Sequence, residues 1–232
     1  MLLFRAGSLM YLCFMRILIV AATEIEIAAA RDHYTKNASV NLNIDFLVTG
    51  IGMTATAYSL TKRLASRKYD LAINAGVAGS FRPEISLGDV VNVVSDSFAD
   101  LGAEEGDKFL SVFDLKLQSK DGFPFWNGKI KNDHAEKFSG LRHLKSVKAI
   151  TVNKVHGNPE SIQKVFVKFH PDIETMEGAA FFYVCAMERI QFLQLRAISN
   201  RVELRNRAEW KLDLAIKNLT TALHLFLNQL VK

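Results

Sequence analysis

Residues 15–26 read MRILIVAATEIE, an apolar stretch that ends in small and polar residues. Its β-branched and apolar residues predict a buried strand over 16–21. The segment after it predicts a helix over 23–32. A buried strand that leads directly into a helix is typical of a parallel sheet covered by helices, so this stretch predicts an α/β fold.

The same alternation of short strands and helices continues along the chain. Further strands are predicted over 45–49, 71–74, 90–94, 147–152, 173–175 and 192–198. One further helix is predicted to follow 50–52 and to end at Arg67, and three others are predicted over 160–169, 178–188 and 213–230. Residues 75–80 are predicted to form a small-residue turn, and 98–140 an irregular excursion with a functional or interface role. The pattern predicts one α/β domain with a central mixed, mostly parallel, twisted sheet flanked by helices.

The composition agrees with one folded domain. The chain has 232 residues, of which 49% are hydrophobic and 23% charged, and these values are typical of a globular domain. Residues 1–14 contain an apolar run that resembles a secretory signal, but this run continues directly into the predicted first strand. We therefore interpret 1–14 as an N-terminal extension, outside the native protein if Met15 is the true start, and 15–232 as the domain.

Charge and cysteine content argue against several classes of partner. The net charge is +5, but the basic residues are scattered, so we predict a solvated basic surface or an anionic small substrate and no nucleic acid. Cys13 and Cys185 lack a second Cys or His at metal-ligand spacing, so we predict reduced thiols, a cytoplasmic location, no metal and no cofactor. No stretch reaches the roughly 18 to 20 apolar residues of a membrane span.

Acidic residues follow two of the predicted strands. Thr23 and Glu26 lie at the end of the first strand, where ligands bind in open parallel sheets, but their spacing also fits a capping box. Glu174 and Glu177 lie at the turn before Gly178, and an ionised carboxylate there offers two acceptor oxygens to a sugar diol. The alternative for this second pair is two solvated turn acids.

Two further kinds of segment end at positions suited to ligand binding. The strand over 192–198 leads into Ser199 and Asn200, where an amide at the sheet edge is either a ligand group or a turn residue. Glycines within 50–52 and 76–79 allow close backbone approach, but neither segment matches a Walker loop or the complete G-x-G-x-x-G of dinucleotide folds.

Together and in this order, these segments resemble the nucleoside phosphorylase and nucleosidase superfamily over nearly the whole chain from Met15. The resemblance is carried by ILIVAATEIE at 17–26, TGIG at 49–52, NAGVAG at 74–79, ETMEGAA at 174–180 and RAISN at 196–200. It implies an enzyme that cleaves the N-glycosidic bond of a small purine nucleoside and forms a homodimer or larger homo-oligomer. Within this superfamily the wording at 176–185 and 196–200 resembles the futalosine hydrolases, which implies release of hypoxanthine in menaquinone biosynthesis.

The resemblance also implies roles for single residues. Glu26 falls where the nucleosidases hold the attacking water, and its charge disfavours the phosphate that a phosphorylase must bind. Met176 is implied to pack against base and sugar, Glu177 to bind the ribose hydroxyls, and Arg196 to lie near the water. The same motifs place Gly52, Ala78, Gly79, Ser199 and Arg201 at the substrate.

Asn200 is the informative departure from the adenine-specific nucleosidases, which carry Asp here to protonate the purine N7. An amide cannot deliver that proton, but it can accept from a protonated N7 and donate to a 6-oxo group, which implies hypoxanthine or guanine as the base. Arg201, Arg205 and Arg207 are candidates for pairing with the carboxylate of futalosine, or else form a solvated basic turn. No role is assigned within 151–157, where the family's purine loop falls, and His156 is predicted to be structural.

Several alternatives stay open. A purine nucleoside phosphorylase of the same fold would depend on phosphate, and another nucleosidase would prefer inosine or methylthioadenosine. A catalytically inactive nucleoside-binding protein would bind without forming product. A dinucleotide-binding oxidoreductase fits less well, because the glycine pattern is incomplete.

Overall fold

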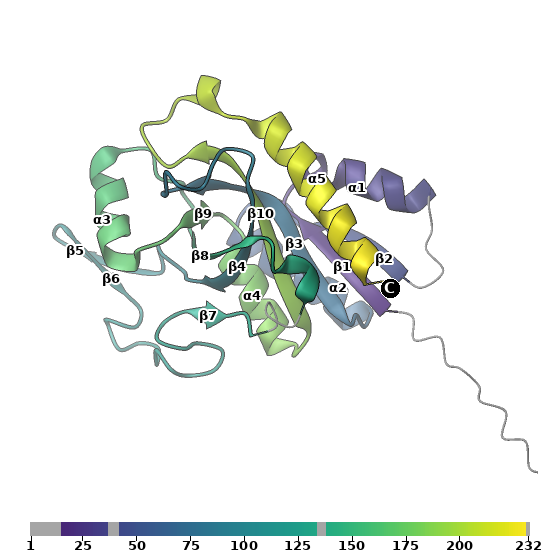
Figure 1. Cartoon of the computed structure of the whole chain (residues 1–232). Coiled ribbons are helices and arrows are strands. Elements are labelled where there is room, and N and C mark those ends of the chain that lie inside the picture. The colour runs from purple at the N-terminus through teal and green to yellow at the C-terminus, as the bar shows by residue number, and fades with distance from the viewer. Residues whose placement is uncertain (1–14, 37–41, 134–137, 231–232) are drawn as a thin grey trace, which may run out of the picture.

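The computed structural model describes residues 15–36, 42–133 and 138–230, and the predicted extension 1–14, with Cys13, lies outside them. The strands are β1 (Met15–Ala21), β2 (Leu42–Val48), β3 (Leu71–Ser80), β4 (Val90–Asp96), β5 (Gly102–Glu105), β6 (Lys108–Ser111), β7 (Ile130–Lys131), β8 (Lys145–Thr151), β9 (Ile173–Thr175) and β10 (Gln191–Arg201). The helices are α1 (Glu24–Lys36), α2 (Met53–Ser66), α3 (Pro159–Phe169), α4 (Gly178–Met187) and α5 (Leu212–Gln229), with 3-10 turns at Ser139–Leu141 and Arg207–Glu209. Helices alternate with strands as predicted from β1 to β3 and from β8 to α5, whereas β3 to β8 follow one another without an α-helix between them (Figure 1).

The strands of the described chain, apart from the β5–β6 pair, form one mixed sheet in the order β10-β4-β8-β9-β3-β1-β2, with β7 paired to β4. Because β10 also pairs with β3, five strands close into a ring, and β1 and β2 extend the sheet beyond it. The pairings of β1 with β2 and β3, of β3 with β10, and of β8 with β4 and β9 are parallel. The predicted mixed, mostly parallel α/β fold is therefore confirmed.

Strand β3 is longer than predicted, and this corrects the interpretation of 75–80 as a turn. The segment continues in strand conformation to Ser80 because β10 pairs with it from Leu71 to Ser80. Small residues at 75–80 allow this close pairing, and the sequence pattern alone does not separate it from a turn. Strand β10 likewise extends to Arg201, so Ser199 and Asn200 lie within the sheet and not after it.

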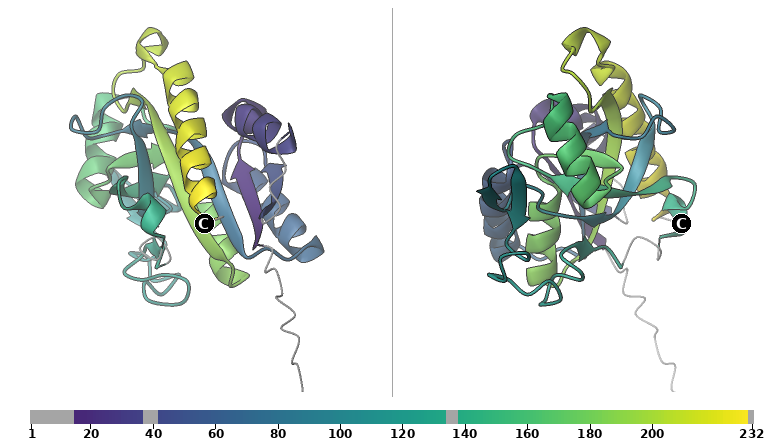
Figure 2. Two further views of the ribbon diagram at one scale, coloured as in Figure 1. Left: turned by 45° about the vertical axis from the view of Figure 1, so that its right-hand side comes forward. Right: turned by 90° about the vertical axis from the view of Figure 1, so that its left-hand side faces the viewer.

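The two faces of the sheet are covered by different helices (Figures 1 and 2). Side chains alternate between the faces along a strand. Leu18 and Val20 of β1 pack in the cluster that includes α2 and α4, whereas Ile17 and Ile19 pack in the cluster that includes α1 and α5. Each such fully buried side chain contributes roughly 1.5–3 kcal/mol, so β1 is fixed from both sides.

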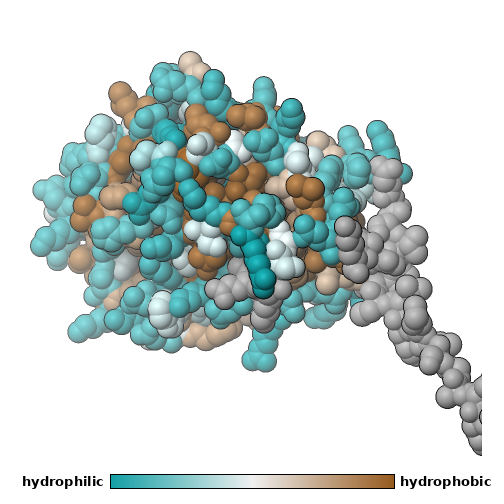
Figure 3. All heavy atoms as spheres, viewed as in Figure 1, coloured by the Kyte–Doolittle hydropathy of each residue, from teal (hydrophilic) through white to brown (hydrophobic). Residues whose placement is uncertain are grey.

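The predicted irregular excursion at 98–140 contains the β5–β6 hairpin, β7 and one 3-10 turn within its described part. On the face shown in Figure 3, hydrophilic side chains cover the periphery, and most hydrophobic ones lie toward the middle. Among the described helices, none is both long enough and apolar enough to cross a membrane.

Candidate functional site

Two groups of polar side chains flank the C-terminal half of β3. The inner cluster consists of Glu26, Arg196 and Glu177 around Gly76. The outer cavity lies beside Gly79 and contains Asn200. Gly76 and Gly79 are three residues apart on one strand, a separation of about 10 Å along the backbone. The two groups are therefore neighbours along the C-terminal half of the same strand.

Glu26 is held by groups from two elements. Its Oε2 accepts hydrogen bonds from the Thr23 N–H at 2.9 Å and the Thr23 hydroxyl at 2.9 Å, so the capping geometry expected from their spacing is present. Its Oε1 accepts from the Val77 N–H at 3.1 Å. This N–H is available because the pairing of β3 with β1 ends at Asn74. Glu26 thus links the start of α1 to the middle of β3.

Arg196 is completely buried, which is unusual for an arginine. Its guanidinium forms an ion pair with Glu177 at 3.7 Å and makes no hydrogen bond within the described residues. A side chain at Gly76 would collide with this guanidinium and would lie 2.7 Å from Glu26 Oε1. Gly76 is therefore required for Arg196 to lie beside the two carboxylates.

Glu177 is buried at the turn before α4, next to half-buried Met176. Its Oε1 accepts from the Gly52 N–H at 3.1 Å. Burial raises the pKa of Glu177, nearby Arg196 opposes this change, and the charge of Glu26 adds to it. The two acids therefore share one compensating cation, and the cluster carries a net negative charge when both are ionised.

Asp96 helps to hold this turn through Thr151. It is fully buried and accepts from the Thr151 hydroxyl at 2.9 Å, Gln194 Nε2 at 3.2 Å and the Ser97 N–H at 2.8 Å. The Thr151 oxygen in turn accepts from the Ala179 N–H at 2.7 Å, in the first turn of α4. Burial raises the pKa of Asp96 to about 7.

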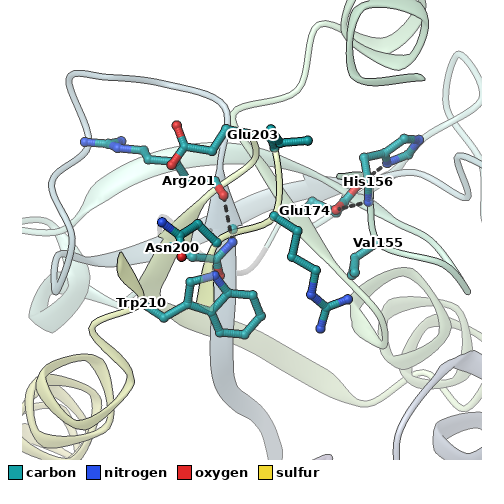
Figure 4. A pocket seen from close by; sticks show the side chains of 11 residues that line it. Val155, His156, Glu174, Asn200, Arg201, Glu203 and Trp210 are labelled. Atoms are coloured by element: carbon teal, nitrogen blue, oxygen red, sulfur yellow. Dashed lines mark hydrogen bonds and ion pairs between the residues drawn. The ribbon is translucent and has the colours of Figure 1, made fainter. Parts of the chain in front are cut away.

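The outer cavity lies where β3, β9 and β10 meet (Figure 4). It is lined by Gly79, Val155, His156, Glu174, Asn200, Arg201, Glu203, Leu204, Arg205, Asn206 and Trp210. Strand β10 contains a bulge between Ile198 and Asn200, which brings Asn200 opposite Gly79. The Asn200 amide accepts from the Ser199 hydroxyl at 2.9 Å and donates to the Arg201 carbonyl at 2.8 Å, so one N–H and one lone pair remain for a ligand.

Glu174 lies across the cavity from Asn200 (Figure 4) and is only 4% exposed. Its Oε1 accepts from the His156 N–H at 2.9 Å, and its Oε2 contacts His156 Nδ1. The alternative of two solvated turn acids is therefore wrong, because both Glu174 and Glu177 are buried. The sequence draws attention to Glu174 but does not reveal its partner, which lies 18 residues away.

The arginines at the end of β10 and after it differ in their contacts. The Arg201 guanidinium donates to the carbonyls of Arg82 at 2.5 Å, Ile85 at 2.6 Å and Pro83 at 3.1 Å. Arg205 lies over the Trp210 ring at 5.5 Å from its centre and also lines the cavity. Arg201 thus anchors a neighbouring loop, while Arg205 keeps its guanidinium at the cavity.

The structure distributes the predicted site residues between the two groups. Glu26, Arg196 and Glu177 meet in the inner cluster, and Gly52 joins it through its N–H. Gly79, Asn200 and Arg201 line the outer cavity. Glu26, Arg196, Met176 and Glu177 are not among the residues that line this cavity. Ala78 and Ser199 are buried between the groups, and the Ser199 hydroxyl oxygen lies 3.4 Å from the Ala78 carbonyl oxygen.

Within 15–36, 42–133 and 138–230, no three or more His, Cys, Asp or Glu side chains gather as a metal site. Cys185 is a buried free thiol whose pKa is raised well above its usual value by desolvation. The inner cluster and the outer cavity supply carboxylates, an amide and a guanidinium.

The chain is similar to known enzymes in sequence and in fold. Residues 46–230 match the model of the phosphorylase superfamily. The futalosine hydrolase of Streptomyces coelicolor is 33% identical over 77% of this chain and 76% of its own length. Solved structures with the same fold include futalosine hydrolase of Helicobacter pylori, with 17% identity, a TM-score of 0.76 and coverage of 93% and 98%. The methylthioadenosine/adenosylhomocysteine nucleosidase of Colwellia psychrerythraea, solved with adenine, has 18% identity, a TM-score of 0.78 and coverage of 94% and 96%.

Proposed function

The chain belongs to the phosphorylase superfamily and, within it, to the futalosine hydrolases, and from this membership we propose that it hydrolyses the N-glycosidic bond of futalosine. The products are hypoxanthine and dehypoxanthine futalosine, in menaquinone biosynthesis. The observation that carries the proposal is a spacing along β3. The Val77 N–H holds Glu26, and two residues further on Gly79 lies beside Asn200. Strand β3 thus brings Glu26, the acid that would hold the attacking water, close to Asn200, the amide that would bind the base.

In the proposed mechanism the bond between C1′ and N9 lengthens first and leaves an oxocarbenium-like ribosyl group. Glu26 orients a water molecule against C1′ and accepts its proton as the new bond forms. Glu177 accepts hydrogen bonds from the ribose hydroxyls, and Met176 packs against base and sugar. Arg196 pairs with Glu177 at 3.7 Å and helps to orient it, while Thr23 and the Val77 N–H orient Glu26.

Hydrolysis is preferred over phosphorolysis for an electrostatic reason. A phosphate bound beside Glu26 and Glu177 would meet two carboxylates and a single buried cation, and like charges at a few ångströms repel strongly where water is excluded. Water is neutral and can donate to Glu26. The inner cluster therefore supports a nucleosidase better than a phosphorylase.

The identity of the base is proposed from Asn200. N7 takes a proton from solvent water as the C1′–N9 bond breaks. The free lone pair of Asn200 then accepts from N7–H, and its free N–H donates to O6 of hypoxanthine. A 6-amino group would place a donor against that donor, and a polar mismatch of this kind at a buried site discriminates by ~10⁴ or more. The nucleosidase of Colwellia psychrerythraea was solved with adenine, which supports a purine as the ligand of this fold.

The decisive experiment is a product assay with futalosine, inosine and methylthioadenosine, each with and without phosphate. We expect futalosine to be cleaved fastest, at a rate independent of phosphate, with hypoxanthine and the free sugar as products. Ribose 1-phosphate as product would establish a phosphorylase, and faster cleavage of inosine or methylthioadenosine another nucleosidase. Tight binding of futalosine without any product would establish a nucleoside-binding protein.

We also propose a cytoplasmic homodimer or larger homo-oligomer. The side chain of Ile51, next to Gly52, is 63% exposed and that of Tyr58, in α2, is 67% exposed, and both support an interface on this part of the surface. Light scattering of the purified chain should give at least twice the mass of one chain. A monomer at micromolar concentration would contradict this proposal.

A further inference from the structure

The outer cavity contains a buried carboxylate, Glu174, that the proposed mechanism does not use. Glu174 is held by the N–H and the ring of His156, which contact one oxygen each. An ionised carboxylate offers about four acceptor positions, so two remain for a ligand. Because Glu174 also lines the cavity that contains Asn200, these positions are available to the same ligand.

The sheet register fixes where this carboxylate lies. Glu174 of β9 pairs with Gly79 of β3, and Gly79 pairs with Asn200 of β10. Residues directly opposite one another on adjacent strands share a face, and the strands are about 4.8 Å apart. The backbones of Glu174 and Asn200 are therefore about 10 Å apart, with a residue that has no side chain between them.

The cavity opens beside Gly79, where both Glu174 and Asn200 line it. A Cβ at Gly79 would lie 3.1 Å from Asn200 Nδ2 and 2.9 Å from a methyl group of Val202, so a larger residue would crowd the amide. A purine in this cavity would present its N7 and O6 edge to Asn200 and the adjacent edge, which carries N1, to Glu174. The two side chains thus read different atoms of one base.

The chemistry of the two edges matches a 6-oxopurine. With N7 and O6 near Asn200, the next ring atom is N1, which carries a hydrogen in hypoxanthine and guanine but only a lone pair in adenine. We propose that Glu174 accepts a hydrogen bond from N1–H of the purine and is a second specificity-determining residue for 6-oxopurine nucleosides. The inference rests on the proposed function for the orientation of the base.

His156 is a positioning residue in this arrangement. A buried carboxylate without donors is costly, and the N–H and Nδ1 of His156 compensate Glu174 while leaving its other acceptor positions toward the cavity. The predicted structural role of His156 agrees with these contacts. His156 is thus expected to affect how firmly Glu174 is held, but not which base it selects.

The test compares two nucleosides in the full-length enzyme: futalosine and its 6-amino counterpart. Glu174→Gln keeps the size of the side chain, but its amide N–H can donate to the N1 lone pair of a 6-aminopurine. We expect the ratio of kcat/KM for the two substrates to fall at least tenfold. His156→Ala keeps the carboxylate, so there the ratio should stay within about threefold of wild type. An unchanged ratio in Glu174→Gln, or an equal shift in His156→Ala, would overturn the inference.

Calorimetry with free hypoxanthine and adenine separates this inference from the proposed function. If wild type does not cleave futalosine but Glu174→Gln binds hypoxanthine at least tenfold more weakly, the inference stands and the proposed function fails. If wild type cleaves futalosine and both proteins bind hypoxanthine equally, only the inference fails. Should Glu174→Gln not fold, wild type decides: 1-methylhypoxanthine should bind at least tenfold more weakly than hypoxanthine, and equal affinity would overturn the inference.

Discussion

The inner cluster and the outer cavity lie on the same strand but are built differently. In the inner cluster, Glu26, Arg196 and Glu177 are nearly or fully buried and are held by one another and by backbone N–H groups. In the outer cavity, a neutral amide and a carboxylate paired with histidine line an open space. This difference indicates that the fold holds the charged groups of the reaction in place, whereas recognition of the base depends on side chains that can be substituted.

Removal of one charge from the inner cluster should have the largest effect. Glu26→Gln keeps an acceptor for Thr23 but loses the general base, so kcat for futalosine should fall by ~10² to 10⁴, with the dissociation constant changed only a few-fold. Single-turnover kinetics and calorimetry provide the two measurements. Glu24→Gln, at an exposed acid in the same helical turn, is the matched control and should leave kcat unchanged. Equal kcat in Glu26→Gln and wild type would refute the role of Glu26.

Exchange of the amide in the outer cavity should alter selectivity more than catalytic power. Asn200→Asp can protonate N7 but cannot donate to O6, so kcat/KM for futalosine should fall by about 10² while that for the 6-amino counterpart rises. Competition between the two substrates measures the change. Asn158→Asp, at the exposed N-cap of α3, is the control with the same chemical change. An unaltered preference in Asn200→Asp would remove Asn200 from base recognition.

The pH dependence of stability tests whether water reaches the buried side chain of Asp96. The pKa of Asp96 is about 7 in the folded state and about 3.9 in an unfolded chain. Between these values the folded state retains a proton that the unfolded state has released, so Asp96 reduces stability as pH rises from about 4 to 7. Asp96→Asn abolishes this loss.

The stability of Asp96→Asn relative to wild type should therefore increase by roughly 2–3 kcal/mol between pH 5 and pH 8, as measured by urea unfolding. Asp107→Asn, at a side chain that is 99% exposed, should show a constant difference over the same range. A constant difference for Asp96→Asn as well would mean that Asp96 ionises like a solvated acid and that water enters this region.

Arg201 should produce the smallest effect, and on stability alone. Arg201→Lys loses the planar group that donates to three loop carbonyls, which should lower the free energy of unfolding by about 1–2 kcal/mol. KM for futalosine should change less than threefold, and thermal unfolding together with steady-state kinetics separates the two quantities. A tenfold rise in KM without loss of stability would instead show that Arg201 binds the substrate, as the sequence predicts.

The sequence patterns predicted those features of the fold and the site that depend on residues close together in the chain. The contact of Thr23 with Glu26 spans three positions, and the alternation of strands and helices is local as well. The sequence could not reveal the continuation of β3 beyond Asn74, because this segment is held by β10, more than 100 residues later. For the same reason it did not show that Arg201 is bound by carbonyls at 82–85, or that Glu174, Gly79 and Asn200 lie in one row.

The bulge between Ile198 and Asn200 has a consequence for how this architecture can be altered. Side chains alternate along a strand, so one additional residue reverses the side to which all later ones point. Deletion of Ser199 would therefore rotate the amide out of the cavity, although Asn200 itself would still be present. Replacement of Asn200 leaves the backbone path unchanged. Selection or engineering can thus retune the preferred nucleobase by point substitution at this position, but insertions and deletions near it should be poorly tolerated.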